Sequence, residues 1–292
     1  MNRKIIATSL ILVSLGLVYF FFVPAFQGKI IVTPIINLGF FSVRWYGLIM
    51  ALAVLSGFLI ARKNAWKFGI EAKQVADFVF WMVIISGVGA RLYFVLFEFG
   101  YFFHNPIEIF KVWNGGISIY GAIITGFVFT FFYARRKGFS QFQLLDLTAL
   151  SLPLAQAVGR FGNFFNQEAF GNPTELPWKM FVSLGNRPHQ FADSSFFHPA
   201  FLYEALWNLV VFYLLMKLIG KHRSGMMAGI YLILYSFGRF VVEGIRLDSQ
   251  LIFGLRVDQI VAVVVFVGGG LFVLKLWRVS QTQSSDLHIK GS

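Results

Sequence analysis

The stretch QVADFVFWMVIISGVGARLYFVLF, residues 74–97, carries only two charged side chains, Asp77 and Arg91. A helix needs about 20 predominantly apolar residues to cross the hydrocarbon core of a bilayer. Residues 74–97 meet this requirement, so they predict a helix that spans a membrane. The fold of the whole chain depends on how often this pattern recurs.

Seven further stretches meet or nearly meet the same requirement, at about 5–23, 45–61, 112–134, 143–161, 199–216, 226–243 and 257–274. The first follows Arg3 and Lys4 and resembles a signal-peptide core, but no small-x-small cleavage site follows it. We therefore expect an uncleaved anchor helix over 1–24, a membrane domain over 25–278 and a cytoplasmic tail over 279–292. The fold class is all-α, a polytopic transmembrane helix bundle.

Composition supports this class. The chain is 57% apolar and 13% charged, with a mean hydropathy of +0.70, whereas soluble domains are roughly half apolar and a quarter charged. The net charge of +12 is divided among short clusters between apolar spans, and no basic arm or domain is present. This pattern indicates membrane orientation and not nucleic-acid binding. Because the sequence contains no cysteine, any thiol chemistry must use a sulfur of the substrate.

The basic clusters predict the topology. With a cytoplasmic N-terminus and eight spans, the cytoplasmic side collects most of the basic residues, namely Arg3, Lys4, Arg62, Lys63, Lys67, Lys73, Arg135, Arg136, Lys137, Lys217, Lys221, Arg223, Lys275, Arg278 and Lys290. The segments 24–44, 98–111, 162–198 and 244–256 then lie outside. The longest of them, about 162–198, contains several prolines and glycines and predicts a small external head or cap.

Two of the spans carry polar residues on one helical face. Gln156, Arg160, Asn163 and Gln167 follow at steps of four, three and four, and share a face if the helix continues to Gln167. Ionisable groups within spans are costly, so they usually face the protein interior and mark functional sites. The structural alternative is a polar seam at a helix end, with Arg160 extending toward the membrane surface.

The stretch 226–243 and the residues just after it place Tyr235, Arg239, Glu243 and Arg246 at steps of four, four and three. Glu243 is then within reach of both arginines. The structural alternative is an intrahelical ion-pair ladder. Two arginines beside one carboxylate leave a net positive charge, which predicts an anionic ligand, and the planar guanidinium suits phosphate.

Other candidates have simpler alternatives. Tyr46 also fits an interfacial aromatic belt, and His198, before Pro199, also fits a helix start. Tyr120 follows a glycine-rich turn that permits close backbone approach. The five histidines lie far apart in the sequence and show no metal-ligand spacing, so we expect neither a metal site nor a cofactor.

Residues 159–171, GRFGNFFNQEAFG, resemble the signature of the prolipoprotein diacylglyceryl transferases, G-R-x-G-N-F-hydrophobic-N-x-E-x-x-G, at every specified position. Four supporting segments occur in the family's order: RWYG at 44–47, GGISIYG at 115–121, HPAFLYE at 198–204 and GRFVVE at 238–243. Together these segments cover the chain from about 44 to 277.

The resemblance implies an enzyme of bacterial lipoprotein maturation, without a cofactor, in the cytoplasmic (inner) membrane. Such enzymes transfer the diacylglyceryl group of phosphatidylglycerol to the lipobox cysteine of a prolipoprotein signal peptide. A thioether forms and glycerol phosphate leaves. The family fold implies seven core helices, to which 5–23 adds an N-terminal helix, and an active site open to the outer leaflet.

The resemblance also implies site residues. The family's important positions fall on Tyr46, Arg160, Asn163, Glu168, Gly171, Arg239, Glu243 and Arg246. Of these, Arg160, Arg239, Arg246 and Gly171, together with His198, are expected to bind phosphatidylglycerol. Many members have a histidine where this chain has Tyr120, and tyrosine has an ordinary pKa of about 10. Tyr120 could accept the thiol proton only if a neighbouring arginine lowered this pKa, and it could instead position the lipid. Glu168 and the lipid phosphate are the other candidate acceptors.

The mechanism expected from these residues is a phosphate clamp. Arg160 and Arg239 hold the phosphodiester and stabilise the charge that develops as the phosphate leaves, while Asn163 and Glu243 maintain this geometry. The main alternative function is a transporter or channel for an anionic solute that uses the same arginines. Transporters often contain repeated halves, and no such repeat is evident in the sequence.

Overall fold

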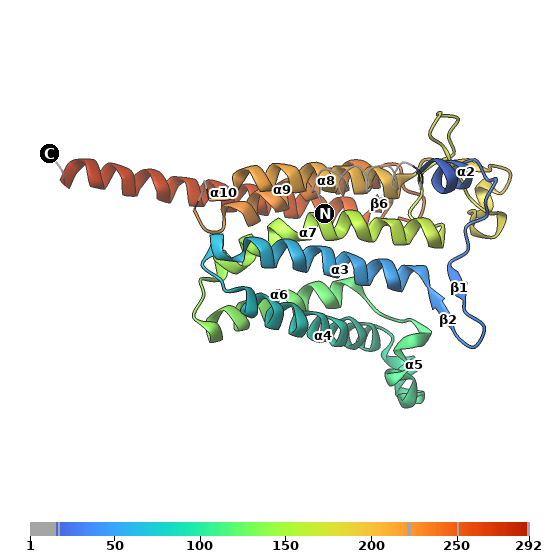
Figure 1. Cartoon of the computed structure of the whole chain (residues 1–292), viewed down its shortest axis with the longest axis horizontal. Coiled ribbons are helices and arrows are strands. Elements are labelled where there is room, and N and C mark those ends of the chain that lie inside the picture. Colours follow the sequence, from blue (N-terminus) through green and yellow to red (C-terminus); the bar gives the residue numbers. More distant parts are fainter. Residues whose placement is uncertain (1–15, 17, 221–222, 250, 291–292) are drawn as a thin grey trace, which may run out of the picture. The chain divides into compact units, whose positions relative to one another are not determined.

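The structure is a computed structural model that describes residues 16, 18–220, 223–249 and 251–290, with side chains up to residue 278 (Figure 1). Most of the expected anchor helix 5–23 lies outside the described residues. Its described end is a π-helix, Val18–Phe22, followed by the short helix α2, Val23–Phe26.

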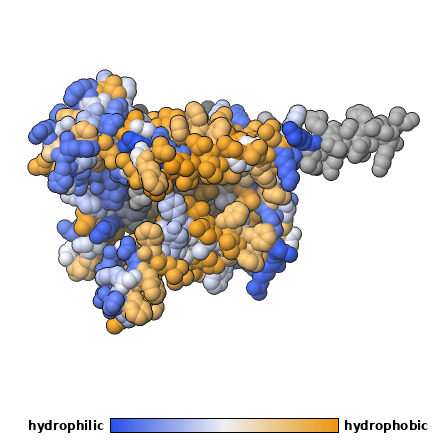
Figure 2. Space-filling model, turned by 180° about the vertical axis from the view of Figure 1, so that it is seen from behind, coloured by the Kyte–Doolittle hydropathy of each residue, from blue (hydrophilic) through white to orange (hydrophobic). Residues whose placement is uncertain are grey.

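Long helices make up most of the described chain. They are α3 (Trp45–Asn64), α4 (Ala72–Phe97), α6 (Ile119–Lys137), α7 (Gln141–Asn166), α8 (Ala200–Leu218), α9 (Met226–Glu243) and α10 (Val257–Lys290). Five helical regions among the described residues are long and apolar enough to cross a membrane: Trp45–Phe68, Ala72–Phe97, Ala200–Leu218, Met226–Glu243 and Val257–Arg278. Apolar side chains cover much of the exposed helical surface on the face in Figure 2. The chain is therefore a multi-pass membrane protein.

Three expected boundaries were wrong. The span expected from 112 begins at Ile119, because Gly115 and Gly116 have φ values of 89° and 72° that interrupt a helix. Helix α7 continues to Asn166, beyond the expected end at 161. Helix α10 continues past 274 to Lys290.

The connections contain short strands that the all-α prediction did not include. Three two-stranded antiparallel sheets pair β1 (Ile35–Asn37) with β2 (Ser42–Arg44), β3 (Met180–Phe181) with β4 (Phe196–Phe197), and β5 (Leu251–Ile252) with β6 (Leu255–Arg256). Strands of two or three residues carry little periodicity, so alternation in the sequence cannot reveal them.

The chain divides into two compact units. Unit 1 comprises the described residues of Met1–Ser56, Pro153–Leu214 and Leu232–Phe272, and unit 2 those of Gly57–Leu152, Leu215–Tyr231 and Val273–Ser292.

In unit 2, α4 and α6 lie side by side (Figure 1) because small residues line their contact. A Cβ atom on Gly89 would lie 2.1 Å from Thr125 Oγ1, and one on Gly121 would lie 2.4 Å from the Gly89 carbonyl oxygen. Close approach of this kind is how membrane helices gain packing energy. Asp146 on α7 accepts hydrogen bonds from the backbone amides of Gly225 and Ala228 and so fixes the start of α9.

Arg91 in unit 2 has a structural role. Its buried guanidinium donates hydrogen bonds to the carbonyl oxygens of Ile109, Gly115 and Gly116, at 2.9, 2.7 and 2.7 Å. It also lies 5.1 Å from the ring centre of Phe102, on the short helix α5 (Phe99–His104). Arg91 thus holds the turn from which α6 and Tyr120 follow.

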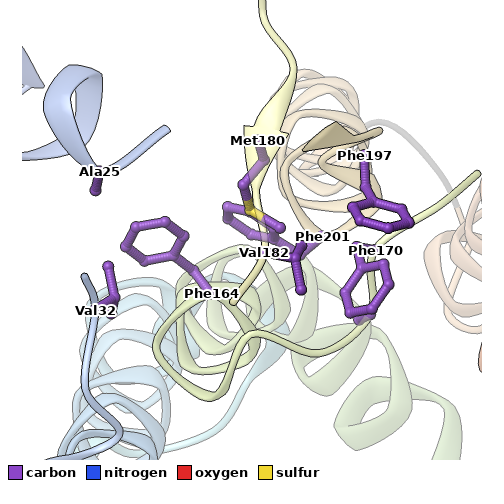
Figure 3. Packing of buried hydrophobic residues seen from close by; sticks show 9 residues of the cluster. Ala25, Val32, Phe164, Phe170, Met180, Val182, Phe197 and Phe201 are labelled. Atoms are coloured by element: carbon purple, nitrogen blue, oxygen red, sulfur yellow. The ribbon is translucent and has the colours of Figure 1, made fainter. Parts of the chain in front are cut away.

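In unit 1, the segment after α7 folds over an aromatic core. Figure 3 shows Phe164 of α7 and Phe201 of α8 beside Phe170 and Phe197 of the cap. The Phe170 and Phe197 rings lie 5.0 Å apart, and those of Phe164 and Phe201 lie 5.5 Å apart. Because α7 includes Asn166, the irregular part of the segment expected as the cap starts at about 167, and its external location stays a prediction. This core connects the end of α7 to the start of α8, where the polar residues gather.

Candidate active site

The polar residues of unit 1 gather around Glu204, in the first turns of α8. Its buried carboxylate contacts Arg160 Nε of α7 at 2.5 Å and Arg239 Nη1 of α9 at 2.6 Å. It also accepts a hydrogen bond from Arg246 Nη1, in the loop after α9, at 3.1 Å. The guanidinium groups of the two expected polar faces therefore converge on one residue. We call Glu204 and these three arginines the arginine cluster.

Additional carboxylates balance the charge of this cluster. Arg239 Nη2 lies 2.8 Å from Glu243 Oε2 and 2.5 Å from Asp258 Oδ2, at the start of α10. Arg246 Nη2 lies 2.7 Å from Asp248 Oδ2. The expected net positive charge around Arg239 and Arg246 was wrong, because residue steps along α9 cannot include carboxylates that α8 and α10 supply.

Arg160 is the least neutralised arginine of the cluster. Among the described residues, the only carboxylate that it contacts is Glu204, whereas Arg239 and Arg246 each contact three within 4 Å. Its side chain is also the most exposed of the three, at 22% against 16% and 12%. An incoming anion would therefore displace the fewest protein contacts at Arg160.

Asn163 connects Arg160 to Glu168. Its Oδ1 accepts a hydrogen bond of 3.5 Å from Arg160, and its Nδ2 donates one of 2.8 Å to Glu168 Oε1. Asn166 donates a second hydrogen bond to the same oxygen at 3.3 Å. Glu168 thus has amide donors as neighbours, and no arginine within 4 Å among the described residues.

Tyr46, in the first turn of α3, packs directly on α7. A Cβ atom on Gly162 would lie 2.9 Å from the Tyr46 ring, so the contact requires glycine at this position. This contact point, Gly162, follows Arg160 by two residues and precedes Asn163 by one in the sequence of α7. Tyr46 belongs to the same unit as the arginine cluster, and its catalytic role stays a prediction.

Gly171 and His198 join the cap to the loop that carries Arg246. The Gly171 amide donates a hydrogen bond to the His198 carbonyl oxygen at 2.8 Å, and a Cβ atom on Gly171 would lie 2.9 Å from the Ile245 carbonyl oxygen. The His198 ring nitrogen Nδ1 lies 3.1 Å from the Tyr203 hydroxyl, which accepts a hydrogen bond from Trp178. These contacts position the loop beside Glu204. A direct contact of Gly171 or His198 with lipid stays a prediction.

Gln167 does not share the face of Arg160. Helix α7 ends at Asn166, and Gln167 adopts a φ of 50° that turns the chain away. Its side-chain oxygen instead accepts hydrogen bonds from the Ser183 amide and Asn186. Gln167 therefore stabilises the cap.

Tyr120 belongs to unit 2, whereas the arginine cluster belongs to unit 1. It lies in the first turn of α6, with its ring 6.5 Å from that of Tyr93, and is 39% exposed. Its role as a proton acceptor stays a prediction.

Glu204 and Asn208 were not among the predicted site residues. A small recess beside the cluster is lined by Glu204, Trp207, Asn208, Tyr235, Gly238 and Arg239. Asn208 lies one turn after Glu204 and is buried, and its Oδ1 has no hydrogen-bond partner among the described residues. The four-residue step from Glu204 to Asn208 was the only available signal.

The charge of the cluster also controls titration in the loop outside the spans. Burial alone would raise the pKa of Asp248, but the hydrogen bonds and positive charge of Arg246 hold that pKa below its ordinary value. Asp248 is therefore ionised at neutral pH and remains paired with Arg246. No group of three or more His, Asp or Glu side chains in the described part of the chain could hold a metal ion.

The model of the family described as prolipoprotein diacylglyceryl transferase matches residues 33–275. The chain belongs to this family. The match includes the arginine cluster, Asn163, Glu168 and the cap, and it begins after the expected anchor helix.

Curated members of the family are similar over nearly the whole chain. Three are named phosphatidylglycerol–prolipoprotein diacylglyceryl transferase. The protein of Fervidobacterium nodosum is 39% identical over 277 residues, which cover 93% of this chain and 95% of the relative. The protein of Synechococcus elongatus is 42% identical over 255 residues, which cover 85% of this chain and 88% of the relative. The protein of Thermotoga maritima is 40% identical over 264 residues, which cover 88% of this chain and 90% of the relative. The similarity therefore includes both structural units.

Proposed function

We propose that this protein transfers the diacylglyceryl group of phosphatidylglycerol to the lipobox cysteine of a prolipoprotein. The observation that carries the proposal is the convergence of Arg160, Arg239 and Arg246 on Glu204, in a membrane chain of the diacylglyceryl transferase family. The cysteine sulfur attacks the glyceryl carbon that carries the phosphate. A carbon–sulfur bond forms, the carbon–oxygen bond breaks, and glycerol phosphate leaves with the electron pair.

In this proposal Arg160 is the first ligand of the lipid phosphate. It contacts one carboxylate and retains guanidinium donors for a phosphate oxygen. Arg239 could join the clamp only if it exchanged a carboxylate contact for the phosphate, because it contacts three carboxylates. Glu204 and Glu243 then act as positioning residues that keep the guanidiniums oriented before the lipid enters. Such preorganised donors stabilise the charge on the leaving phosphate.

Glu168 is the acceptor that we propose for the thiol proton. The thiol must lose this proton because the thiolate is the nucleophile. Glu168 is connected to Arg160 through Asn163 and forms no ion pair with an arginine among the described residues, so its carboxylate is not committed to a guanidinium. Tyr120 and the lipid phosphate are the alternative acceptors. Tyr46 would pack against the bound lipid beside Gly162.

The arrangement in the membrane is also part of the proposal. Seven helices, α3, α4 and α6–α10, would span the cytoplasmic membrane after an N-terminal helix. The cap and the arginine cluster would then face the outer leaflet, where phosphatidylglycerol and the signal peptides of exported prolipoproteins meet. The distribution of Lys and Arg supports this orientation.

A transfer assay tests the function. The purified protein is incubated in liposomes with glycerol-labelled phosphatidylglycerol and a lipobox peptide, with a Cys→Ser peptide as control. We expect diacylglyceryl peptide and free glycerol phosphate from the cysteine peptide alone. An anion transporter would instead move solute across the liposome membrane and form no product, and that result would reject the proposal.

A further inference from the structure

The connection between α9 and α10 ends in a hairpin with an apolar tip. Strands β5 and β6 pair Leu251 with Arg256 and Ile252 with Leu255, which leaves Phe253 and Gly254 as a two-residue turn. The apolar side chains of the hairpin are all more than half exposed, and Phe253 is fully exposed at 101%. Nothing in the described part of the chain covers this ring.

Phenylalanine is an unfavourable residue for this turn. Phe253 and Gly254 have φ values of 51° and 80°, and two positive values are typical of a type I′ turn. That turn favours Asn-Gly or Asp-Gly, because a bulky side chain is disfavoured at positive φ. The stability of the turn therefore does not explain Phe253, whereas a contact outside the chain would.

The position of the hairpin identifies what that contact is. Helix α9 ends at Glu243 and α10 starts at Val257, and both belong to candidate membrane spans. Each arm of the hairpin has two paired residues and reaches less than roughly 10 Å, so the tip stays close to the membrane surface. Helix α10 follows directly with exposed apolar residues, such as Val261 and Val264. The lipid that covers these residues is thus the apolar phase nearest to Phe253.

The base of the hairpin is polar and bound to the arginine cluster. Arg256 Nη1 donates hydrogen bonds to the carbonyl oxygens of Glu243 and Arg246 and, at 2.9 Å, to Ser249 Oγ. Asp258, two residues later, contacts Arg239 at 2.5 Å. A polar base and an apolar tip suit a segment that crosses from the headgroups into the acyl chains.

We propose that the hairpin Leu251–Arg256 inserts its apolar tip into the acyl-chain region of the adjacent leaflet. The insertion anchors the loop that carries Arg246 at the depth of the lipid headgroups. Lipid is the partner, and neither a second copy of the chain nor a peptide is required.

Because the chain has no cysteine, a single introduced thiol can report membrane depth. Phe253→Cys is labelled with a nitroxide in liposomes of phosphatidylcholine and phosphatidylglycerol. Its accessibility to oxygen and to a water-soluble nickel chelate is measured by electron paramagnetic resonance. Val264→Cys, 65% exposed on α10, is the lipid reference. Glu175→Cys in the cap, whose side chain is 87% exposed, is the aqueous reference.

We expect the label at 253 to match the label at 264, with high oxygen and low nickel accessibility. Nickel accessibility equal to that at 175 would overturn the proposal, and so would shielding from both reagents, which indicates a protein contact.

A second label, at Leu255→Cys, tests whether the Phe253 ring itself anchors the hairpin. Phe253→Asn suits the turn and removes the apolar tip, so it should raise the nickel accessibility at 255 several-fold. An unchanged value would overturn the anchoring role. Neither measurement depends on transfer activity, so failure of the proposed function would be distinguishable.

Discussion

Glu204 is the residue on which the arginine cluster depends. Its carboxylate is buried and contacts three guanidinium groups, and removal of one partner from a buried ion pair typically costs about 3–5 kcal/mol. We expect Glu204→Ala to lower the free energy of unfolding by an amount of this order, measured by denaturant titration in detergent. Glu175→Ala is the matched control, because Glu175 is an exposed carboxylate paired with Lys179, and exposed pairs contribute about 0–1 kcal/mol. Equal effects of the two substitutions would contradict the central role of Glu204.

Asp248 gives the loop of Arg246 a pH dependence. The pKa of Asp248 is lower in the folded state than its ordinary value, because the effect of Arg246 outweighs that of burial. The Asp248–Arg246 pair therefore stabilises the folded protein fully above the unfolded pKa of about 3.9. This stabilisation is lost as the pH falls through the pKa that Asp248 has in the folded state. We expect Asp248→Asn to lower the Tm at pH 7, and the difference from the wild type to disappear on acidification. A difference that is independent of pH would contradict this pairing.

At the scale of elements, the contact between α8 and α9 depends on Gly238. A Cβ atom there would lie 2.0 Å from Trp207 Cδ1, whose ring is fixed by a 2.8 Å hydrogen bond from Nε1 to the Leu234 carbonyl oxygen. We expect Gly238→Ala to lower the free energy of unfolding by about 1–3 kcal/mol, as overpacking does. Gly268→Ala in α10 is the control, because a Cβ atom there meets nothing within 4 Å. An equal loss at both glycines would show that helix packing is not the cause.

Residue spacing in the sequence predicted which side chains share a face of one helix, but not which side chains meet from different helices. The steps along α9 placed Arg239 and Glu243 on one face, and their 2.8 Å contact confirms this. They could not predict Asp258, because it comes from another helix and meets Arg239 only in the folded chain. Likewise, helical periodicity correctly placed Arg160 and Asn163 on one face of α7. It misplaced Gln167, because the helix ends before this residue and periodicity cannot reveal the positive φ that Gln167 adopts.

The span boundaries follow the same reasoning. Hydropathy located the apolar part of α6, but Gly115 and Gly116 start a turn held by Arg91, so the helix begins at Ile119. The GRFGNFFNQEAFG signature supplied candidate site residues that hydropathy could not. Its glycines proved to be contact positions, since Gly162 receives the Tyr46 ring and Gly171 receives the loop of Ile245.

At the scale of the whole molecule, the proposed topology places the cap and the α6–α7 connection on opposite sides of the membrane. We expect Glu175→Cys to react with a membrane-impermeant maleimide in intact spheroplasts, and Lys137→Cys to react only after permeabilisation. The reason for this difference is that loops rich in Lys and Arg, such as the one that carries Lys137, are retained in the cytoplasm. Labelling of both sites without permeabilisation would contradict the orientation.

The central claim is that guanidiniums from two helices hold the phosphate of a lipid while its glyceryl carbon is attacked. The most direct measurement is the transfer of labelled diacylglycerol from phosphatidylglycerol to a lipobox peptide by Arg160→Lys and Arg239→Lys in liposomes, with folding checked by Tm. Lysine keeps the charge and loses the planar set of donors. We predict a rate reduced by about 10²–10³ for Arg160→Lys, the usual effect of removing one such donor, and a reduced rate for Arg239→Lys. A wild-type rate from either folded variant would contradict the claim.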